Sequence, residues 1–454
     1  MTKLFDDFPK VTSKEWKQKI QFDLKGLDYN QTLNWQSLEG IMVKPFYHSD
    51  DAASYLNSNT RATNWSIGQS IYVSNEKQAN KQAQECVNKG VEHIHFILPN
   101  TDNSLKELLY NLDGSRITIS FQPLVLSEAC IQNFDNIGEL RNSRLHLDPI
   151  GQLARSGNWF NNLSEDQNQV AKAKNTLKNF ESVISVDMSL YQNAGANIIQ
   201  QLAYGLAHAN EYLQWYNDEK NVDLNFNIAT GSNYFFEIAK NRALQLLWAT
   251  LRSEYSNQPN MIISATPSKR NKTLYDYNTN MLRTTTECMS AVLGGAQIIY
   301  NLPYDAIYHK ENEFGNRIAR NQLLILKHES FFDVVDNPVD GAYYIEELTA
   351  SLAEQALTLF KDIEKNGGFL NQLKAGTIQR KIKESAAKEQ ERFDSGDITL
   401  VGTNAHPNNA DKMNDNLELY PFIKINKRKT LIEPIIERRL SESLEKERLK
   451  NENE

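Results

Sequence analysis

The residues best suited to chemistry in this sequence begin with its one close histidine pair, His93 and His95. Residues two apart on a strand point to the same face, so the two imidazoles could bind one metal ion. No third ligand can be named from the sequence, and Glu92 would face the opposite side of the strand. Hydrogen-bonded structural histidines are therefore the favoured interpretation, and no metal site is predicted.

Other motifs that carry catalytic chemistry are missing from the sequence. It has no GxSxG nucleophile elbow, no P-loop, no HExxH and no GxGxxG. The adjacent carboxylates Glu346 and Glu347 lie in a helix-forming stretch, which is typical of a solvated helix face. The residues taken alone therefore assemble no active site.

The stretch SVISVDMSLYQNAGANIIQQLAYGLAHANEYL, residues 182–213, indicates a strand, a turn and a helix for which Asn193 is the expected cap. The turn at 188–191 follows the strand, where a barrel enzyme usually keeps its catalytic groups. It contains Ser189 and Leu190 but neither an acid nor a histidine. The expected working position thus carries no catalytic side chain.

The elements that would position these residues repeat eight times from residue 71 onward. Strand-like runs near 71, 91, 116, 144, 183, 225, 261 and 296 alternate with helix-like segments. Strands that alternate with helices indicate a parallel sheet, and eight such units are typical of a (β/α)8 barrel. A doubly wound open sheet is the alternative, but it more often has fewer units and a Gly-rich first turn. We therefore predict an α/β fold with a TIM barrel.

Many of these strands carry a polar stripe at period two. Barrel strands are normally filled with branched aliphatic side chains, and buried polar groups need hydrogen-bond partners. If the stripes point inward, the axis is either a channel for a long polar ligand or a buried polar network with water. The sequence leaves both open. The candidate lining residues are His93, His95, Thr118, Ser120, His146, Asp148, Ser185, Asp187, Asn225, Asn227 and Ser264.

Composition and charge exclude several classes of partner. The 454 residues carry a net charge of −8, whereas nucleic-acid affinity depends on clustered Lys and Arg. The three cysteines are far apart without a CxxC, which favours a reducing compartment. The N-terminus has acids and lysines from the start and no apolar run, so neither a signal peptide nor a membrane span is expected. We expect a cytoplasmic protein without nucleic-acid or membrane partners.

The chain divides by composition into four parts: an N-terminal arm at 1–65, the barrel at 66–332, a helical extension at 333–404, and a linker with a charged C-terminal helix at 405–454. The arm is too apolar to stay in water, yet has too little periodicity for a core of its own. It is either a strap on its own barrel or a segment that wraps a partner. Its candidate contact residues are Trp16, Leu33, Trp35, Ile41, Phe46 and Tyr47.

Six segments resemble methylmalonyl-CoA mutase in collinear order over nearly the whole chain. They are YNQTLNWQSLEGIMVKP (29–45), NAGANIIQQLAYGLAHANEYL (193–213), FNIATGSNYFFEIAKNRALQLLWATL (226–251), NEFGNRIARNQLLILKHES (312–330), VDNPVDGAYYIEELT (335–349) and RFDSGDITLVGTN (392–404). The resemblance implies a barrel that threads the pantetheine arm of CoA along its axis between small polar side chains. It also implies a separate cobalamin domain, whose adenosylcobalamin starts the radical rearrangement of methylmalonyl-CoA and succinyl-CoA.

The sequence departs from that family at the positions that do the chemistry. SIGQSIYV stands where active chains have TIRQYAGF, so Gly68 replaces an arginine and Ser70 a tyrosine. DMSLYQNAGA stands for SGYHMQEAGA, so Leu190 replaces a histidine, and leucine can neither donate a hydrogen bond nor transfer a proton. SATPSKRNKT stands for RTHSQTSGWS, and no histidine lies in a DxHxxG motif. We therefore expect no cobalamin-binding domain and no bound cofactor in this chain.

The resemblance with these departures is to the small, non-catalytic subunit of the mutase. It implies a heterodimer in which a large subunit binds adenosylcobalamin and substrate, and in which this chain is structural. One alternative is the substrate-binding component of a split cobalamin-dependent acyl-CoA mutase. Another is a barrel that senses an acyl-CoA or docks a metallochaperone-type partner. Retained CoA binding would favour the split enzyme, and a monomer that binds ligand alone would favour the sensor.

Overall fold

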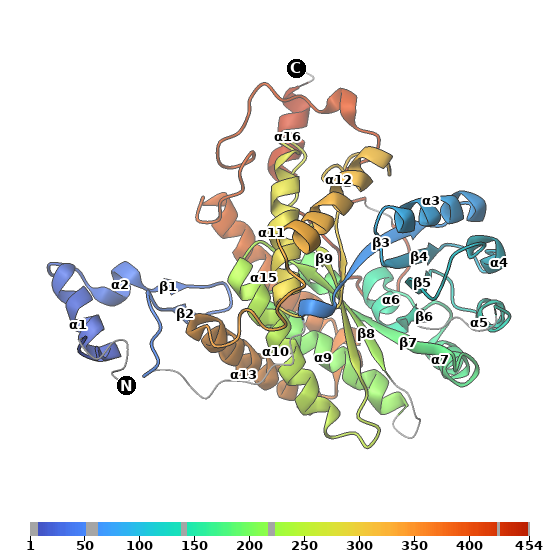
Figure 1. Ribbon diagram of the computed structural model, residues 1–454, viewed down its shortest axis with the longest axis horizontal. Helices are drawn as coiled ribbons and strands as arrows, with labels where there is room; N and C mark the ends of the chain where they lie inside the picture. Colours follow the sequence, from blue (N-terminus) through green and yellow to red (C-terminus); the bar gives the residue numbers. More distant parts are fainter. Residues whose placement is uncertain (1–7, 51–61, 138–142, 217–222, 425–426, 453–454) are drawn as a thin grey trace.

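The computed structural model describes residues 8–50, 62–137, 143–216, 223–424 and 427–452, and its centre is a closed barrel of parallel strands (Figure 1). The strand order β10-β3-β4-β5-β6-β7-β8-β9 follows the chain and closes between the last strand and the first. The prediction of a (β/α)8 barrel is confirmed. The strands are β3 (Ser66–Tyr72), β4 (His93–Leu98), β5 (Thr118–Pro123), β6 (Ser143–Leu147), β7 (Phe180–Asp187), β8 (Leu224–Thr230), β9 (Met261–Pro267) and β10 (Ile298–Tyr300).

Helices follow the strands and cover the outside of the barrel. They are α3 (Glu76–Asn88), α4 (Leu105–Leu108), α5 (Glu128–Asp135), α6 (Pro149–Ser156), α7 (Leu163–Thr176), α8 (Ser189–Asn193), α9 (Ile198–Trp215), α10 (Tyr234–Arg252), α11 (Thr279–Leu293) and α12 (Glu313–Leu324), which continues as the π-helix η2 (Ile325–Glu329). The helix expected to start after Asn193 begins later, because 189–193 form a short helix of their own. Its cap is Asn197, whose side chain accepts the Gln200 N–H in a capping box.

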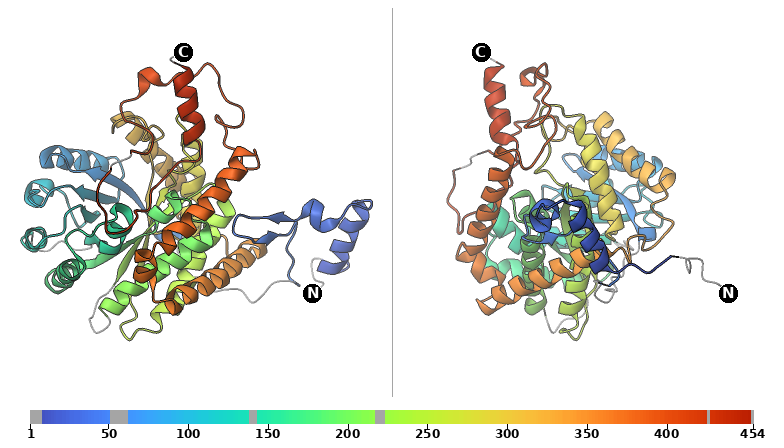
Figure 2. Two further views of the ribbon diagram at one scale, coloured as in Figure 1. Left: turned by 180° about the vertical axis from the view of Figure 1, so that it is seen from behind. Right: turned by 90° about the vertical axis from the view of Figure 1, so that its left-hand side faces the viewer.

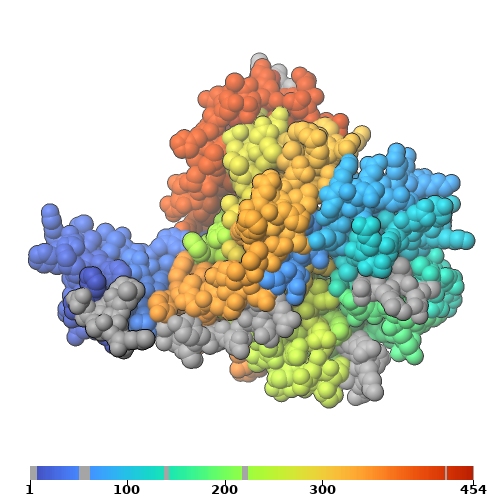
Figure 3. Space-filling view, viewed as in Figure 1, coloured from blue at the N-terminus to red at the C-terminus, as the bar shows by residue number. Residues whose placement is uncertain are grey.

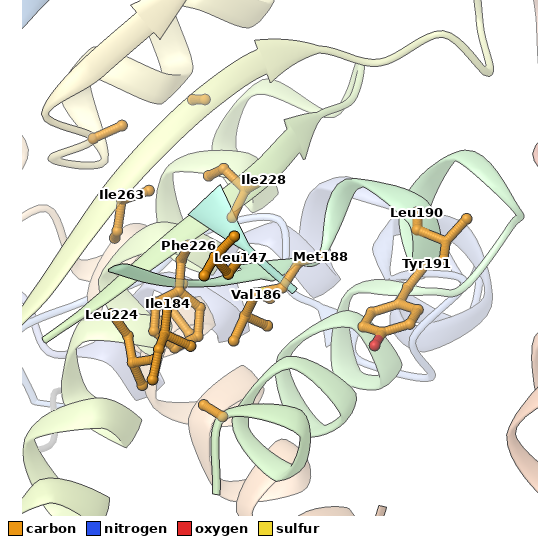
Figure 4. Close-up of a cluster of buried hydrophobic side chains, with 14 of the residues drawn as sticks. Leu147, Ile184, Val186, Met188, Leu190, Tyr191, Leu224, Phe226, Ile228 and Ile263 are labelled. Carbon is orange, nitrogen blue, oxygen red and sulfur yellow. The ribbon is translucent and has the colours of Figure 1, made fainter. Parts of the chain in front are cut away.

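The outward faces of the strands form the hydrophobic core between barrel and helices. In Figure 4, Ile184 and Val186 of β7 lie beside Leu224 and Phe226 of β8. The Phe226 ring also meets Trp248 of α10 edge-on, with 5.3 Å between ring centroids. Because neighbouring residues on a strand alternate between faces, the polar residues between these aliphatics are left to the axis.

The N-terminal arm has two parts with different surroundings. It contains α1 (Ser13–Asp23), α2 (Tyr29–Leu33), the two-stranded sheet of β1 (Trp35–Gln36) and β2 (Met42–Val43), and η1 (Ala62–Asn64). The hairpin lies on its own barrel, since Ile41 is buried in the main core. The lobe of α1 and α2 projects away from the barrel, and α1 buries none of its residues (Figure 3).

The chain after the barrel forms further helices and a long tail. Its helices are α13 (Tyr343–Lys365), α14 (Phe369–Lys374), α15 (Thr377–Asp394), η3 (Asn414–Asn416) and α16 (Glu442–Asn451). Figure 2 shows the tail running behind the barrel, where the Ile435 N–H donates to the Ala154 carbonyl. Nowhere in the described ranges is a helix long and apolar enough to span a bilayer.

Candidate functional site

The axis of the barrel is filled by side chains from strands that are not neighbours. The rings of His95 on β4 and His146 on β6 lie 5.0 Å apart between centroids, although β5 separates their strands. His95 also lies 5.7 Å from the ring of Tyr300 on β10, with β3 between them. Such contacts are only made across the inside of the barrel. We call His93, His95, His146 and Tyr300 the axial cluster.

Hydrogen bonds join this cluster to the polar stripes of adjacent strands. His93 uses one ring nitrogen towards Thr118 and the other towards Ser120, at 2.5 and 2.8 Å. His95 lies 2.7 Å from the same Ser120 hydroxyl and 3.2 Å from the Gln122 amide oxygen. The axial imidazoles of β4 therefore have polar partners within the barrel wall, as a buried network requires.

The stripes of β7, β8 and β9 continue this network. The Asn227 amide approaches the His146 ring at 3.3 Å, and Asn225 donates to the Ser182 hydroxyl at 2.6 Å. Ser185 stands opposite Asn225 in the register of β7 and β8, and is buried. Ser264 of β9 stands opposite Asn227 in the same way. These candidate lining residues therefore share the axis-facing side of the barrel.

Burial keeps the axial histidines neutral. Loss of water lowers the pKa of His95 to about 4, and lowers the pKa of His93 and His146 well below the ordinary value of 6.5. For His93, the positive charge of Arg144 acts in the same direction after burial. A group with such a pKa remains unprotonated near neutral pH, so these imidazoles are not poised as general acids there.

Tyr300 is the member of the axial cluster that sequence reasoning missed. A Cβ atom on Gly68 would stand 2.6 Å from two carbons of the Tyr300 ring, which is closer than side-chain atoms approach. The phenol therefore occupies the space that the absence of a side chain at Gly68 leaves. Burial raises the pKa of Tyr300, and the hydroxyls of Ser120 and Ser264 oppose that rise. The available signal was the position of Tyr300 two residues after Ile298, which places both side chains on the same face of the last strand.

The three positions where the family resemblance places chemistry carry none here. Gly68 faces the axis and is covered by Tyr300, while Ser70 stands opposite His95 in the register of β3 and β4. Leu190 lies on α8, is 1% exposed and belongs to the hydrophobic core (Figure 4). An aliphatic side chain in a dry core offers neither a proton nor a hydrogen bond.

Two acids of the predicted lining have partners outside the axis. Asp148 caps α6 through the Gly151 N–H at 2.8 Å, and forms an ion pair with His208 of α9 at 2.9 Å. Burial raises its pKa, but His208 and the hydroxyl of Tyr212 outweigh burial and leave the pKa below its ordinary value. Asp187, at the end of β7, pairs with Arg155 of α6. Asp148 directly follows β6 and Asp187 is the last residue of β7, so both lie where the chain turns towards the helices.

The candidate contact residues of the arm divide between its two parts. Trp35 meets Phe236 of α10 edge-on at 5.9 Å, and Tyr47 lies 5.2 Å from Tyr344 of α13. Ile41 is buried and Leu33 is half-buried. Trp16 stacks on Phe46 within the arm itself, with 5.0 Å between centroids. The arm is thus a strap on its barrel at the hairpin and an uncovered lobe beyond it.

A cavity of about 570 Å³ lies beside the axis on the C-terminal side of the barrel. Its walls come from the arm hairpin, the start of α9, the loop after β8 and α15. No member of the axial cluster is among the residues that line it. Within the described parts of the chain, no group of three or more His, Cys, Asp or Glu side chains could hold a metal ion.

Comparison with known proteins identifies the family. Residues 145–450 match the family model described as methylmalonyl-CoA mutase. The chain belongs to the methylmalonyl-CoA mutase family. It is 33% identical to a protein of Porphyromonas gingivalis named methylmalonyl-CoA mutase small subunit, over 92% of this chain and 73% of that protein. Small subunits of Streptomyces virginiae and Propionibacterium freudenreichii are each 27% identical, over 88% and 81% of this chain and over 71% and 64% of their own lengths.

The match is not restricted to proteins named as small subunits. A methylmalonyl-CoA mutase of Cereibacter sphaeroides is 28% identical over 86% of this chain, which spans 64% of that protein. The methylmalonyl-CoA mutase family therefore includes both kinds of relative for this chain.

Proposed function

We propose that this chain is the non-catalytic small subunit of an adenosylcobalamin-dependent methylmalonyl-CoA mutase, and that it acts in the cytoplasm. It pairs with a large subunit that binds cofactor and substrate and isomerises methylmalonyl-CoA and succinyl-CoA. The names of the relatives in three bacteria support the subunit type. The observation that carries the proposal is the axial cluster, which fills the axis that the family resemblance assigns to pantetheine.

The filled axis speaks against substrate binding by this chain. A pantetheine arm on the axis would have to displace Tyr300 from its contact with Gly68 and the ring of His95. It would also interrupt the bonds that His93 and His95 make to Ser120. Buried polar groups that lose their partners cost about 1–3 kcal/mol each, so breaking these bonds would oppose binding of the arm.

The residues of this chain do not fit the corrin cofactor of the family. The axial histidines are committed to bonds inside the barrel, and His208 is committed to Asp148 and the Tyr191 hydroxyl. Leu190 stands where the resemblance places a histidine next to the substrate. We therefore derive no catalytic step through cobalamin on this chain and assign the cofactor to the partner.

The uncovered lobe of the arm supports pairing with a second protein. Phe22 is 79% exposed, Leu27 65% and Trp16 48%. Apolar side chains gathered on a projecting segment are typical of protein–protein contacts. In this proposal the hairpin fixes the arm to its own barrel, and the lobe of α1 and α2 lies against the large subunit.

The test is co-expression with a cobalamin-binding large mutase subunit from the same source. We expect a one-to-one complex whose mutase activity survives replacement of Ser120 and Asn227 by alanine in this chain. Each chain alone and the Tyr300→Ala chain would be titrated with CoA. Activity that depends on Ser120 or Asn227, or CoA binding by the unaltered chain, would instead support the substrate-binding component of a split mutase.

A further inference from the structure

A second hollow lies beyond the C-terminal end of β10, away from the axis. Its volume is about 420 Å³, within the range of sites that hold small molecules or single side chains. The loop after β10, the start of α11 and the tail around η3 enclose it. The lining residues, which we call the tyrosine pocket, are Tyr277, Tyr304, Asp305, Tyr308, His309, Asn312, Asp415, Asn416, Leu417 and Glu418.

Three aromatic rings form one side of the tyrosine pocket. The Tyr277 ring lies 5.9 Å from Tyr304 and 5.2 Å from Tyr308 between centroids. Tyr308 is 5% exposed as a whole residue, but its hydroxyl oxygen is not among the buried polar atoms that lack a partner in the described ranges. The ring is therefore packed, while the hydroxyl keeps access to the hollow that Tyr308 lines. A packed aromatic wall with accessible polar groups is typical of a site that orients a small ligand.

The charges around these rings are of one sign. Asp305 is 4% exposed, and its carboxylate accepts a hydrogen bond from the Asn312 amide at 2.8 Å. Across the described part of the chain no Lys, Arg or His nitrogen forms an ion pair with Asp305, although buried carboxylates are usually paired. Asp415 is exposed at the rim, and Glu418 pairs with His309 at 3.2 Å.

The cation that would match this environment is missing from the pocket wall. Neither lysine nor arginine is among the lining residues. Burial raises the pKa of Tyr308, and the neighbouring rings and Asp305 raise it further, which is the effect of an electron-rich, acidic surrounding. Aromatic faces and carboxylates both attract positive charge, most strongly where water is excluded.

We propose that the tyrosine pocket binds an organic cation, a quaternary ammonium or guanidinium group, between the tyrosine rings and Asp305. The group belongs either to a free small molecule or to a basic side chain of a partner protein. In both cases the chemistry of recognition is the same. The site is independent of the axis and of the subunit role proposed above.

The test compares two probes of equal shape and different charge. The full chain is titrated with choline and with 3,3-dimethylbutan-1-ol, the neutral carbon isostere of choline, by calorimetry. We expect choline to bind about tenfold more tightly, as a desolvated cation–π contact implies. Equal affinity for both probes, or no binding of choline, overturns the proposal.

Matched variants then locate the site. Tyr304→Phe keeps the ring and should bind choline within about twofold, whereas Tyr304→Leu should lose about tenfold. Asp305→Asn should weaken the binding of choline but not the binding of the isostere. Asp415→Asn tests the same loss of charge at an exposed position, where the substitution leaves the fold intact. Choline binding that is unchanged in Tyr304→Leu and in both Asn variants would place the cation elsewhere and overturn the assignment.

A last comparison distinguishes the two sources of the cation. Choline is titrated into the co-purified complex with a large mutase subunit. Binding equal to that of the free chain indicates a small-molecule site. Binding present in the free chain and lost in the complex indicates that a basic side chain of the partner occupies the pocket. Failure of choline in both preparations overturns the proposal.

Discussion

The barrel axis and the N-terminal arm place side chains in opposite conditions. In the axis, polar residues are buried and bonded to one another, so that Ser120 alone serves both His93 and His95. In the lobe of the arm, apolar residues such as Phe22 stand in water without a contact to their own barrel. Many axial polar groups have hydrogen-bond partners, although the Tyr300 hydroxyl, the Ser264 hydroxyl and the Asn225 amide oxygen have none in the described ranges. Bonded groups in a closed interior indicate a structural role, whereas exposed apolar side chains on a projecting segment favour a protein contact. The difference supports the proposal that this chain acts through its outer surface.

The largest expected effect comes from removing the arm. Deleting residues 1–45 should abolish co-purification with the large subunit, because the apolar lobe is lost, while the barrel still folds. Pull-down of a tagged large subunit measures pairing, and circular dichroism of the truncated chain measures folding. Deletion of 1–45 also removes the hairpin and exposes the barrel surface that Ile41 covers. Deletion of 1–28 alone spares the hairpin and is the matched control for that exposure. A truncated chain that co-purifies at full strength would contradict the assignment of the arm to the contact with the large subunit.

The next largest effect is the loss of stability in acid that the axial histidines cause. In the unfolded chain the axial histidines take up protons below pH 6.5, but in the folded barrel they do so only at lower pH, near 4 for His95. The contribution of these histidines to the free energy of unfolding is therefore fully present above pH 6.5. It falls as the pH drops towards 4, by up to about 1.4 kcal/mol per pH unit for each histidine. Urea unfolding between pH 7 and pH 4.5 measures this slope.

Two variants assign that acid sensitivity to the axis. His95→Gln should reduce the slope between pH 6.5 and 4.5, because one group with a depressed pKa has been removed. His328→Gln, at an exposed position on η2, should leave the slope as it is. A slope that is the same in all three proteins would show that the axial histidines do not govern the response to acid.

A third effect tests the packing of Tyr300. Tyr300→Ala should reduce the free energy of unfolding by about 3 kcal/mol, because a buried ring is replaced by a cavity. Tyr300→Phe keeps the ring and should cost less than about 1 kcal/mol. Denaturant unfolding at pH 7.5 compares the two. Similar losses in both variants would mean that the hydroxyl, rather than the ring, holds the axis together.

The smallest expected effect on stability lies in the lobe. Phe22→Ser should change the free energy of unfolding by less than about 0.5 kcal/mol, because the side chain is 79% exposed. It should nevertheless weaken pairing with the large subunit, which a titration followed by size-exclusion chromatography measures. Unchanged pairing would remove Phe22 from the interface while leaving the rest of the lobe to be tested.

The sequence predicted the barrel because its signals are local. Eight apolar runs and the helices between them are visible in windows of about ten residues. The packing of Tyr300 against Gly68 was not visible, since barrel closure brings together two residues from opposite ends of the repeat. Asp148 was misplaced because the period-two pattern was extended one residue past β6, where the carboxylate caps α6.

The tail shows the same limit. Its many charges are typical of a solvated helix, yet Glu445 of α16 is fully buried and forms an ion pair with Arg439 at 2.6 Å. Glu445 also accepts the Leu274 N–H at 2.8 Å, from the loop before α11. Such pairings depend on segments far apart in the chain, so composition alone does not reveal them.

The contact between Tyr300 and Gly68 has a consequence for the order of events during synthesis. Gly68 lies on the first strand of the barrel and Tyr300 on the last, and the two stand opposite each other where the barrel closes. The first strand therefore leaves the ribosome long before its partner exists, and one of its edges stays unpaired in the meantime. Long-range pairing of this kind is slow, and an unpaired edge is prone to aggregation. Translation arrested before residue 300 would leave the first strand with that edge open.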